Sequence, residues 1–281
     1  MINKLNTHKQ QGFTLIGLCV ILVMIGLLAG AVMIGKYMVQ ASNMRGQIAQ
    51  IERYNQAVNS FRTKFGALPG DMPAATANQY GFTVGSACNG NRGSRDGNGL
   101  IEGYIAPATF DQTTGETALF WQDLTSAFAD SRLGEAYGDS GNGKPIRCQL
   151  NQRWSTADIS VYFPIARIGL GDFLYVYSVN GANWYGLSTI NSIGWGTLNS
   201  TANIPVKQAY AMDAKMDDGV PTTGHVQANY LNGSAKALYT APNTAAAGGD
   251  SASCYDTTTN AYSTRYNGGS GENCALSFQF Q

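Results

Sequence analysis

Charged side chains are scarce in this chain: they make up 13% of its 281 residues, and 18 basic residues balance 18 acidic ones. Such a dilute and balanced charge gives no electrostatic basis for binding nucleic acid, which needs a positive surface. Histidine is scarcer still, since His8 and His225 are the two in the chain. A Ser-His-Asp triad would have to be built around His225, and no nucleophile-elbow motif accompanies it. We therefore expect no enzymatic activity.

Charge is absent altogether from Phe13 to Gly35, and this run is strongly apolar. As a helix, its roughly 23 residues would rise about 35 Å, enough to cross a bilayer core of about 30 Å. Lys4, His8 and Lys9 precede the run with no acidic residue among them. Because positive charge stays on the cytoplasmic side, we expect a single-pass protein with a cytoplasmic N-terminus and the rest of the chain outside.

Small residues recur within the apolar run. Gly26 and Gly30 form a small-xxx-small pair, and Ala31 and Gly35 repeat the spacing. Such pairs let helices approach each other closely in lipid. The alternative interpretation is that glycine is simply common in membrane helices. Cys19 lies in the same run, and we expect it to be a small, buried packing residue.

The junction in front of the apolar run, from Gly12 to Ile16, reads GFTLI and follows a short polar leader. It resembles the leader of type IV prepilins and type II secretion pseudopilins. The resemblance implies that a prepilin peptidase cuts after Gly12 and methylates the new amino-terminal Phe13. The alternative is an ordinary secretory signal, cut at small residues such as Ala29 to Ala31, which would release the apolar run.

The chain departs from this family at Gly17. Members of the family normally carry a glutamate at this position, which neutralises the N-terminus of the neighbouring subunit, since an unpaired charge in hydrocarbon is costly. Gly17 cannot supply that charge, and it weakens the helix by about 1 kcal/mol. A subunit with nothing above it in the filament does not need the glutamate. Gly17 therefore favours a minor or initiating subunit over an abundant shaft protein; a degenerate copy that does not assemble is the alternative.

Beyond Gly35 the helix continues as an amphipathic pattern. Apolar residues at spacings of three and four form one stripe: Ile51, Tyr54, Val58, Phe61 and Phe65. Polar residues occupy the other sides: Gln47, Gln50, Arg53, Gln56 and Asn59. Leu68 to Asp71 then predicts a turn with Pro and Gly at its centre. We expect a leader over residues 1–12, an assembly helix over 13–66 and an extracytoplasmic pilin-like head over 67–281.

The head is predicted to mix short strands with two short helices. Alternating runs rich in β-branched and aromatic residues predict strands over 159–165, 173–179, 183–190, 226–231 and 275–280. Helices are predicted from a capping box of Thr113 and Glu116 to about Gly134, and over 205–216; residues 241–249 predict a surface loop. The expected fold class is α+β: a long N-terminal helix, half membrane-spanning and half amphipathic, packed on an antiparallel β-sheet in a large globular head.

Four of the five cysteines lie outside the apolar run: Cys88, Cys148, Cys254 and Cys274. An even number in an oxidising compartment predicts disulfides, and three connectivities are open. We favour Cys254 with Cys274, which closes a short loop next to the C-terminus as in many pilins, and this leaves Cys88 with Cys148. The alternative is a zinc site, although no Cys-x-x-Cys or clustered histidine accompanies these residues.

Two acidic segments are candidate cation sites. The segment from Asp96 to Glu102 is similar to the middle of an EF-hand-like calcium loop, with oxygen ligands on Asp96, Asn98 and Glu102. Its first ligand position falls on Ser94, and the final bidentate glutamate is missing. The alternative for this segment is a tight Asp-Gly/Asn-Gly turn.

The second acidic segment comprises Asp213, Asp217 and Asp218. Asp213 and Asp217 would share one face at a helix end, where like charges repel unless a cation or Lys215 compensates. The alternative is a solvated helix end. No cofactor is certain from the sequence, and a structural calcium ion is the hypothesis to test.

Together these features predict a structural pilin-like or pseudopilin subunit in the bacterial inner membrane with a periplasmic head. Its expected partners are a prepilin peptidase, other pilin or pseudopilin subunits and the membrane itself, and no nucleic acid. The sequence leaves open whether the subunit serves a pilus or a secretion apparatus. One alternative is an adhesin or substrate-recognition module at a filament tip, which would use exposed aromatic residues at Trp184, Tyr185 and Trp195. Another is a membrane-anchored hydrolase that depends on His225.

Overall fold

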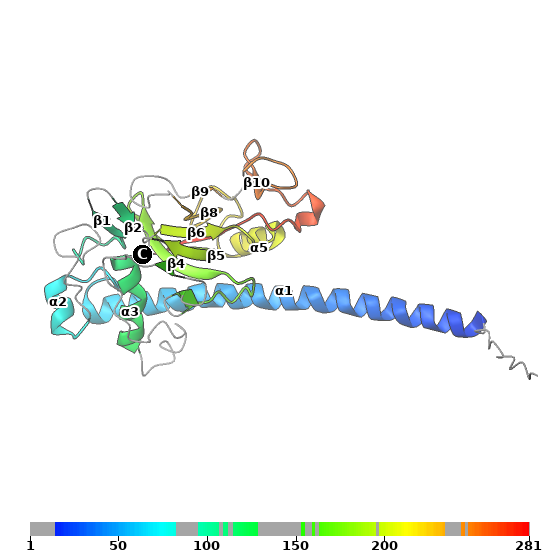
Figure 1. Ribbon diagram of the computed structural model, residues 1–281, viewed down its shortest axis with the longest axis horizontal. Coiled ribbons are helices and arrows are strands. Elements are labelled where there is room, and N and C mark those ends of the chain that lie inside the picture. The colour runs from blue at the N-terminus through cyan, green and yellow to red at the C-terminus, as the bar shows by residue number, and fades with distance from the viewer. Residues whose placement is uncertain are drawn as a thin grey trace, which may run out of the picture. The chain divides into compact units, whose positions relative to one another are not determined.

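The computed structural model describes residues 15–82, 95–106, 109–111, 115–128, 153–154, 159–160, 163–194, 197–233, 243–244 and 247–280. The chain divides into two compact units, residues 1–43 and residues 44–281. One long helix, α1 (Leu15–Phe65), belongs in part to each unit (Figure 1). It ends as expected, because Gly66 adopts a φ of 74° and donates its backbone N–H to the Arg62 carbonyl at 2.8 Å.

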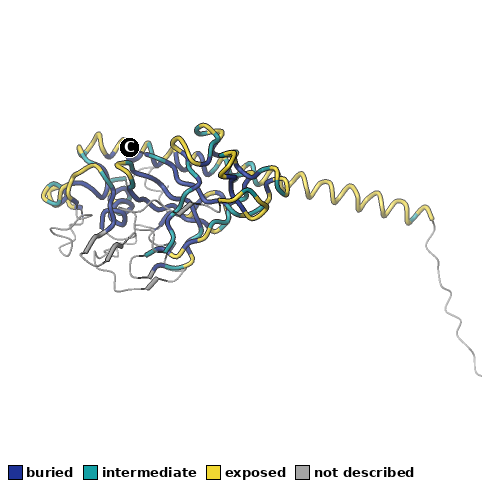
Figure 2. Tube along the Cα trace, turned by 90° about the horizontal axis from the view of Figure 1, so that it is seen from above, coloured by how far each residue is buried: buried dark blue, intermediate teal, exposed yellow. Residues whose placement is uncertain are grey.

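In the first unit, α1 is apolar and exposed. From Leu18 to Val39 every residue is exposed, as the yellow stretch of the tube in Figure 2 shows. The most apolar window has a mean hydropathy of 2.9 and is 0% buried. By length and composition, this helix can cross a membrane. Cys19 is exposed as well, so the expectation that its thiol would be buried is not met within this chain.

In the second unit, α1 supplies one wall of the core. The predicted stripe is confirmed: Ile51, Tyr54, Val58 and Phe61 are buried. The ring of Tyr54 lies with its centroid 5.0 Å from that of Trp121 and 6.1 Å from that of Tyr185. Tyr54 therefore joins α1 to both the helix and the sheet that carry these two aromatic residues.

The sheet is organised around its longest strand, β5 (Ala182–Gly194). Its first half pairs with β4 (Phe173–Val179) on one side and with β12 (Leu276–Phe280) on the other, so Leu187 has a partner in both strands. Its second half pairs with β6 (Thr197–Thr201) and β3 (Arg153–Trp154), and β7 (Val226–Gln227) continues the sheet beyond β12. All these pairs are antiparallel, as predicted for an α+β fold.

The β4–β5 connection is a two-residue hairpin of Asn180 and Gly181, with φ values of 53° and 77°. This is the geometry of a type I′ turn, which Asn-Gly favours because both positions need positive φ. Further along β5, Gly186 lies directly beneath the Tyr175 ring, where an added Cβ would come within 2.2 Å of the ring. A glycine at this position lets the aromatic ring cross the strand.

The remaining elements surround this sheet and helix. The helices are α2 (Ala74–Gln79), α3 (Glu116–Phe128), α5 (Val206–Met216) and the 3₁₀ turn η2 (Asn267–Gly269). Three short antiparallel pairs complete the described structure: β1 (Tyr104–Ala106) with β2 (Thr109–Asp111), β8 (Asn229–Tyr230) with β9 (Asn243–Thr244), and β10 (Tyr255–Asp256) with β11 (Ala261–Tyr262).

Two strand predictions are wrong. The described residues of the range 159–165 do not form a strand: Ile159 and Ser160 are helical, the Phe163 N–H donates to the Ile159 carbonyl at 2.9 Å, and Ile165 makes a single bridge. Pro164 explains this, because it cannot donate to a strand ladder. The predicted strand over 226–231 is two short strands in different sheets. They separate at Ala228, whose N–H donates to the Pro221 carbonyl at 2.7 Å.

The assignment of Gln47 and Gln50 to the solvent side of α1 is also wrong, because both are buried. Gln50 accepts a hydrogen bond from the Arg167 N–H and donates one to the Ile165 carbonyl, each at 3.0 Å. Gln47 accepts one from the Ile168 N–H at 3.1 Å. These amides satisfy backbone groups of the 165–168 segment that are not paired with the neighbouring strand.

The disulfide between Cys254 and Cys274 is confirmed, with a Cα–Cα distance of 4.9 Å. Cys88, Cys148 and Thr113 lie outside the described residues. Of the predicted 241–249 loop, residues 243–244 form β9 and 247–249 are described, while 241–242 and 245–246 lie outside the described residues. An exposed aromatic patch at Trp184 and Tyr185 is contradicted, since their exposed fractions are 7% and 0%. Trp195, the third residue of that patch, also lies outside the described residues.

Candidate functional site

Three carboxylates converge at the end of α1, and we call them the loop cluster: Asp71, Asp96 and Glu116. One oxygen of each lies within 4.8 Å of the others. Asp71 ends the predicted Pro-Gly turn after α1, Asp96 lies in the loop over 95–103, and Glu116 opens α3. The fold therefore brings together three segments that are far apart in sequence.

Asp71 is held by backbone donors. It is 2% exposed and accepts N–H groups from Gly97 at 2.8 Å, Asn98 at 3.1 Å and Gly99 at 2.8 Å. Successive N–H groups that point at one carboxylate form an anion-binding concavity. Burial nevertheless outweighs these bonds and raises the pKa of Asp71 to about 6.

Glu116 is fully buried and holds the same loop from the other side. Its carboxylate accepts the N–H groups of Asp96 at 3.2 Å and Glu102 at 3.0 Å. Burial, together with the charges of Asp71 and Asp96, raises the pKa of Glu116 to about 9. The sequence predicted Glu116 to be a helix-capping residue, whereas both of its oxygens accept hydrogen bonds from the loop.

A buried ion pair fixes the beginning of the loop. The Arg95 guanidinium donates to both oxygens of Asp123, at 2.6 and 2.9 Å, and both side chains are almost fully buried. The same carboxylate accepts the Gly70 N–H at 2.8 Å. Removing either partner would leave an uncompensated buried charge, so this pair locks the loop to α3 and to the turn after α1.

The predicted ligands Asp96, Asn98 and Glu102 do contact one another, but the Asn98 side-chain amide links the two carboxylates. Asn98 Nδ2 donates to Asp96 at 3.1 Å and to Glu102 at 3.3 Å, while Asn98 Oδ1 accepts the Leu100 N–H at 2.7 Å. The tight-turn alternative therefore accounts for these three residues. The oxygens with the right chemistry for calcium are those of the loop cluster, which could hold a hard cation or share a proton.

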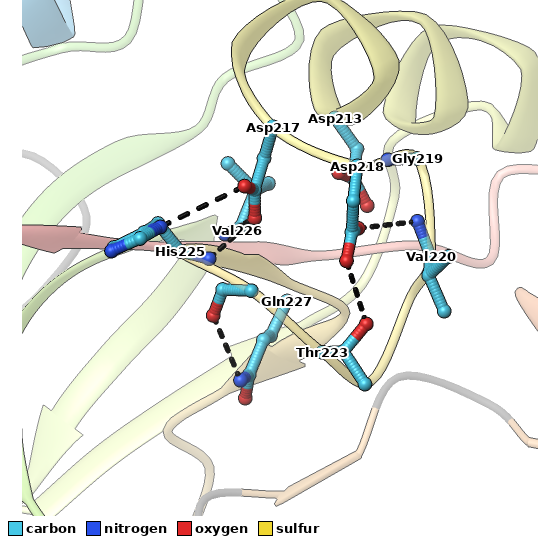
Figure 3. A network of polar contacts seen from close by, with 10 residues as sticks. Asp213, Asp217, Asp218, Gly219, Val220, Thr223, His225, Val226 and Gln227 are labelled. Atoms are coloured by element: carbon cyan, nitrogen blue, oxygen red, sulfur yellow. Dashed lines mark hydrogen bonds and ion pairs between the residues drawn. The ribbon is translucent and has the colours of Figure 1, made fainter.

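The second group, the helix-end cluster, is formed by Asp213, Asp217 and Asp218 at the end of α5 (Figure 3). Buried Asp213 accepts the Gly219 N–H at 3.0 Å and the Tyr262 hydroxyl at 2.7 Å. Its burial raises the pKa of Asp213 to about 6. Tyr262 belongs to the loop closed by the disulfide, so Asp213 ties that loop to α5.

The other two carboxylates of the helix-end cluster shape the chain that follows α5. Asp217 accepts the N–H groups of His225 and of Val226, the latter at 3.1 Å. Asp218 accepts the Val220 N–H and the Thr223 hydroxyl, both at 2.8 Å, and these bonds lower its pKa. Each acid thus has a structural role in one turn, as Figure 3 shows.

His225 does not form part of a triad-like arrangement among the described residues. Its side chain is 74% exposed, and Nδ1 lies 3.7 Å from a carboxylate oxygen of Asp217. The Asp217 carboxylate already accepts two backbone N–H groups, so the exposed imidazole makes only a surface contact with it. The geometry gives no support to a hydrolase built on His225.

Some of the residues predicted to act in processing and assembly lie in the part of the chain that the structure describes, and others do not. Gly12 and Phe13 lie outside the described residues. Gly17, Gly26 and Gly30 lie on α1, and no described atom lies within 4 Å of the Cβ position of Gly26 or Gly30. No protein-family model, curated protein or solved structure matches this chain.

Proposed function

We propose that this protein is a structural pilin-like subunit that assembles through its N-terminal helix. In this proposal a prepilin peptidase cuts between Gly12 and Phe13, and the mature chain waits in the bacterial inner membrane with its head in the periplasm. It then joins other pilin or pseudopilin subunits in a type IV pilus or a type II secretion pseudopilus.

The observation that carries the proposal is the exposed, uncharged part of α1. A helix that is apolar on every side must be covered by lipid or by other helices, because water is a poor solvent for it. The second part of the same helix lies in the core of a folded head. One continuous element thus combines a membrane-type surface with a firmly attached domain, which suits a subunit that passes from bilayer to filament.

The head supports the same interpretation. An antiparallel sheet packs on the amphipathic part of α1, and a disulfide joins Cys254 to Cys274 near the C-terminus. Disulfides persist in oxidising compartments, so this bond agrees with export of the head across the inner membrane. The bond also agrees with the predicted orientation, in which the residues after Gly35 lie outside the cytoplasm.

Gly17 assigns the subunit a minor or initiating position within this proposal. A glutamate at this point of the helix would neutralise an adjacent N-terminal amine in hydrocarbon. Glycine has no side chain that could do so. A subunit at the filament tip has no neighbour that needs the charge. We therefore expect few copies per filament.

Incorporation into filaments tests the proposal. The full chain is expressed with a pilus machinery and, separately, with a secretion pseudopilus machinery, and sheared filaments are probed for it by immunoblot. The wild type should appear at low copy number with one of the two, and Gly12→Val, which blocks cleavage, should remain in the membrane. Gly46→Ala is the matched control, because its added Cβ makes only an ordinary contact with Arg167 at 3.6 Å. Absence of the wild type from both filaments would contradict the proposal.

A further inference from the structure

Two neighbouring cavities open between the end of α1 and the end of β12, and we call them together the α1–β12 groove. The larger has a volume of about 360 Å³ and the smaller about 210 Å³, and Gln279 and Phe280 line both. On the α1 side the walls are formed by one ridge of residues at spacings of four and three: Asn55, Asn59, Arg62 and Gly66. The groove thus runs between a helix and the last strand of the chain.

The groove has the length of a short extended peptide. Its ridge covers about three helical turns, or about 16 Å, and an extended chain of about five residues has the same length. The opposite wall lies where the edge of β12 becomes uncovered. β7 pairs with β12 at Ser277 and Phe278, and the Gln279 N–H donates to the His225 carbonyl at 2.7 Å. Among the described strands, none pairs with this edge of β12 beyond that bond.

Three of the five residues that line the smaller cavity carry an amide: Asn55, Asn59 and Gln279. Asn59 is exposed and Gln279 is half-buried, and neither side chain hydrogen-bonds to another described residue. Asn55, beside them, has a buried Oδ1 atom without a hydrogen-bond partner. An amide has a donor and an acceptor, as a peptide group does, so it can pair with a main chain of any sequence. The smaller cavity therefore offers amide groups that the head itself does not use.

The larger cavity has walls of bare backbone and one exposed cation. Gly66, Gly99 and Gly181 line it, and the space within 4 Å of each Cβ position is empty. Its two charged lining residues differ in accessibility. Arg62 is exposed, whereas Asp71 is 2% exposed and already accepts three loop N–H groups. An occupant therefore meets a positive side chain and room for a main chain, which favours an acidic segment over a basic one.

A saccharide is the other ligand class that amide side chains recognise, and the aromatic residue of the groove argues against it. Phe280, which lines both cavities, is 7% exposed. Its ring stacks on that of Tyr185 with centroids 4.1 Å apart, and the Phe120 ring centroid lies 5.6 Å away. These contacts hold the ring in the core, so it offers no open face on which a sugar ring could stack.

We propose that the α1–β12 groove binds an extended, acidic peptide segment of a partner protein, about five residues long. The main chain of the segment pairs with the amides of Asn59 and Gln279, beside the end of β12. One carboxylate, from an acidic side chain or a C-terminus, pairs with Arg62. The proposal concerns the head alone and holds whether or not the protein enters filaments.

The test is the binding of dye-labelled peptides to the full chain in detergent, measured by fluorescence anisotropy. The probes are pentapeptides of alternating threonine and valine, which favour the extended conformation, with one glutamate at each position in turn. A matched set has glutamine in place of glutamate. At least one glutamate peptide should bind, and more tightly than its glutamine counterpart by up to about fivefold, as expected for one exposed ion pair. Failure of every peptide to bind would overturn the proposal.

Variants of the ridge assign the binding to the groove. Arg62→Gln should abolish the preference for glutamate, and Asn59→Leu should weaken the binding of every peptide by roughly two- to tenfold. Both residues are exposed, so the unfolding midpoint of the head should be kept. Arg53→Gln and Gln56→Leu make the same changes at exposed positions of α1 outside the groove and should bind as the wild type does. Equal losses in these controls would contradict the assignment, and so would binding of chitohexaose by a chain that binds none of the peptides.

Discussion

The two parts of α1 share one backbone and differ in what surrounds them. From Leu18 to Gly35 the residues are uncharged, apolar and exposed. From Gln47 to Phe61 one face of the helix, which includes the amides Gln47 and Gln50, is buried, and the other face is exposed. The first part is not amphipathic, since every face of the helix is apolar. The second part has one face that fits the sheet and the aromatic residues of α3.

This difference shows that helix formation and burial are separate properties of the sequence. Both parts form the same regular helix, but only the amphipathic part finds its partners within the head. The first part needs a surrounding of another kind, either lipid or neighbouring helices. Substitutions on the two parts should therefore fail in different assays, and the following four separate them in order of expected effect.

The largest effect is expected for Phe61→Ala in the buried part. Phe61 is 0% exposed, and its ring centroid lies 4.6 Å from that of Phe65 and 5.5 Å from that of Phe82. The cavity should lower the free energy of unfolding of the head by about 3–5 kcal/mol. Denaturant unfolding in detergent measures it, with Leu27→Ala on the exposed part as the control. Equal losses in both variants would remove the distinction between the two parts.

A charge in the exposed part should affect insertion and leave the head intact. Ile25→Lys places an ammonium group near the middle of the apolar run, which costs about 3 kcal/mol in a bilayer. Membrane fractionation should show loss of the chain from the bilayer. Gln56→Lys, at a solvent-exposed position on the half of α1 that packs in the head, should fractionate normally. If Ile25→Lys instead unfolded the head and left insertion unchanged, the assignment of this part to the membrane would be wrong.

A smaller effect is expected for the buried amides. Gln50→Leu would leave the Arg167 N–H and the Ile165 carbonyl without their partner on α1. Both hydrogen bonds are only partly buried, so the two lost partners together should cost the head about 1–3 kcal/mol of stability. Gln56→Leu, at an exposed position, is the matched control for the change of residue type. A stability loss no greater than that of the control would show that the amides are not needed to hold the 165–168 segment.

The smallest energetic effect belongs to Gly17, although its effect on assembly should be visible. Gly17→Glu and Gly17→Ala both improve helix propensity, by less than about 1 kcal/mol. Only the glutamate supplies a counter-charge, so it alone should increase the number of copies along the filament shaft. Quantitative immunoblotting of sheared filaments measures this. Equal copy numbers for the two variants would show that the missing carboxylate does not limit assembly.

Local patterns predicted much of this fold because they act over a few residues. The stripe on α1 and the helix after Pro205 have the periodicity that the structure contains. The strand over 173–179 has the predicted bounds, but six successive residues are buried, so its burial does not alternate. Asn180-Gly181 is a further local signal, since it marks the β4–β5 hairpin that the sequence interpretation did not use. Pro164 should likewise have argued against a strand over 159–165.

The candidate site was less predictable, because its geometry depends on contacts between distant segments. The sequence drew attention to Asp96, Asn98 and Glu102 for their spacing, but the carboxylates that meet Asp96 are Asp71 and Glu116. No short-range pattern relates these three acids. In the same way, the spacing of Gln47 and Gln50 assigned them to solvent, whereas a crossing backbone segment made them core residues.

The most direct test of the proposed function is the intact mass of the chain recovered from membranes in the presence of a prepilin peptidase. The proposed processing predicts a chain that begins at Phe13, carries one methyl group and retains the whole apolar part of α1. A chain that begins near Val32, without the apolar part, would contradict it and make the head a soluble secreted domain.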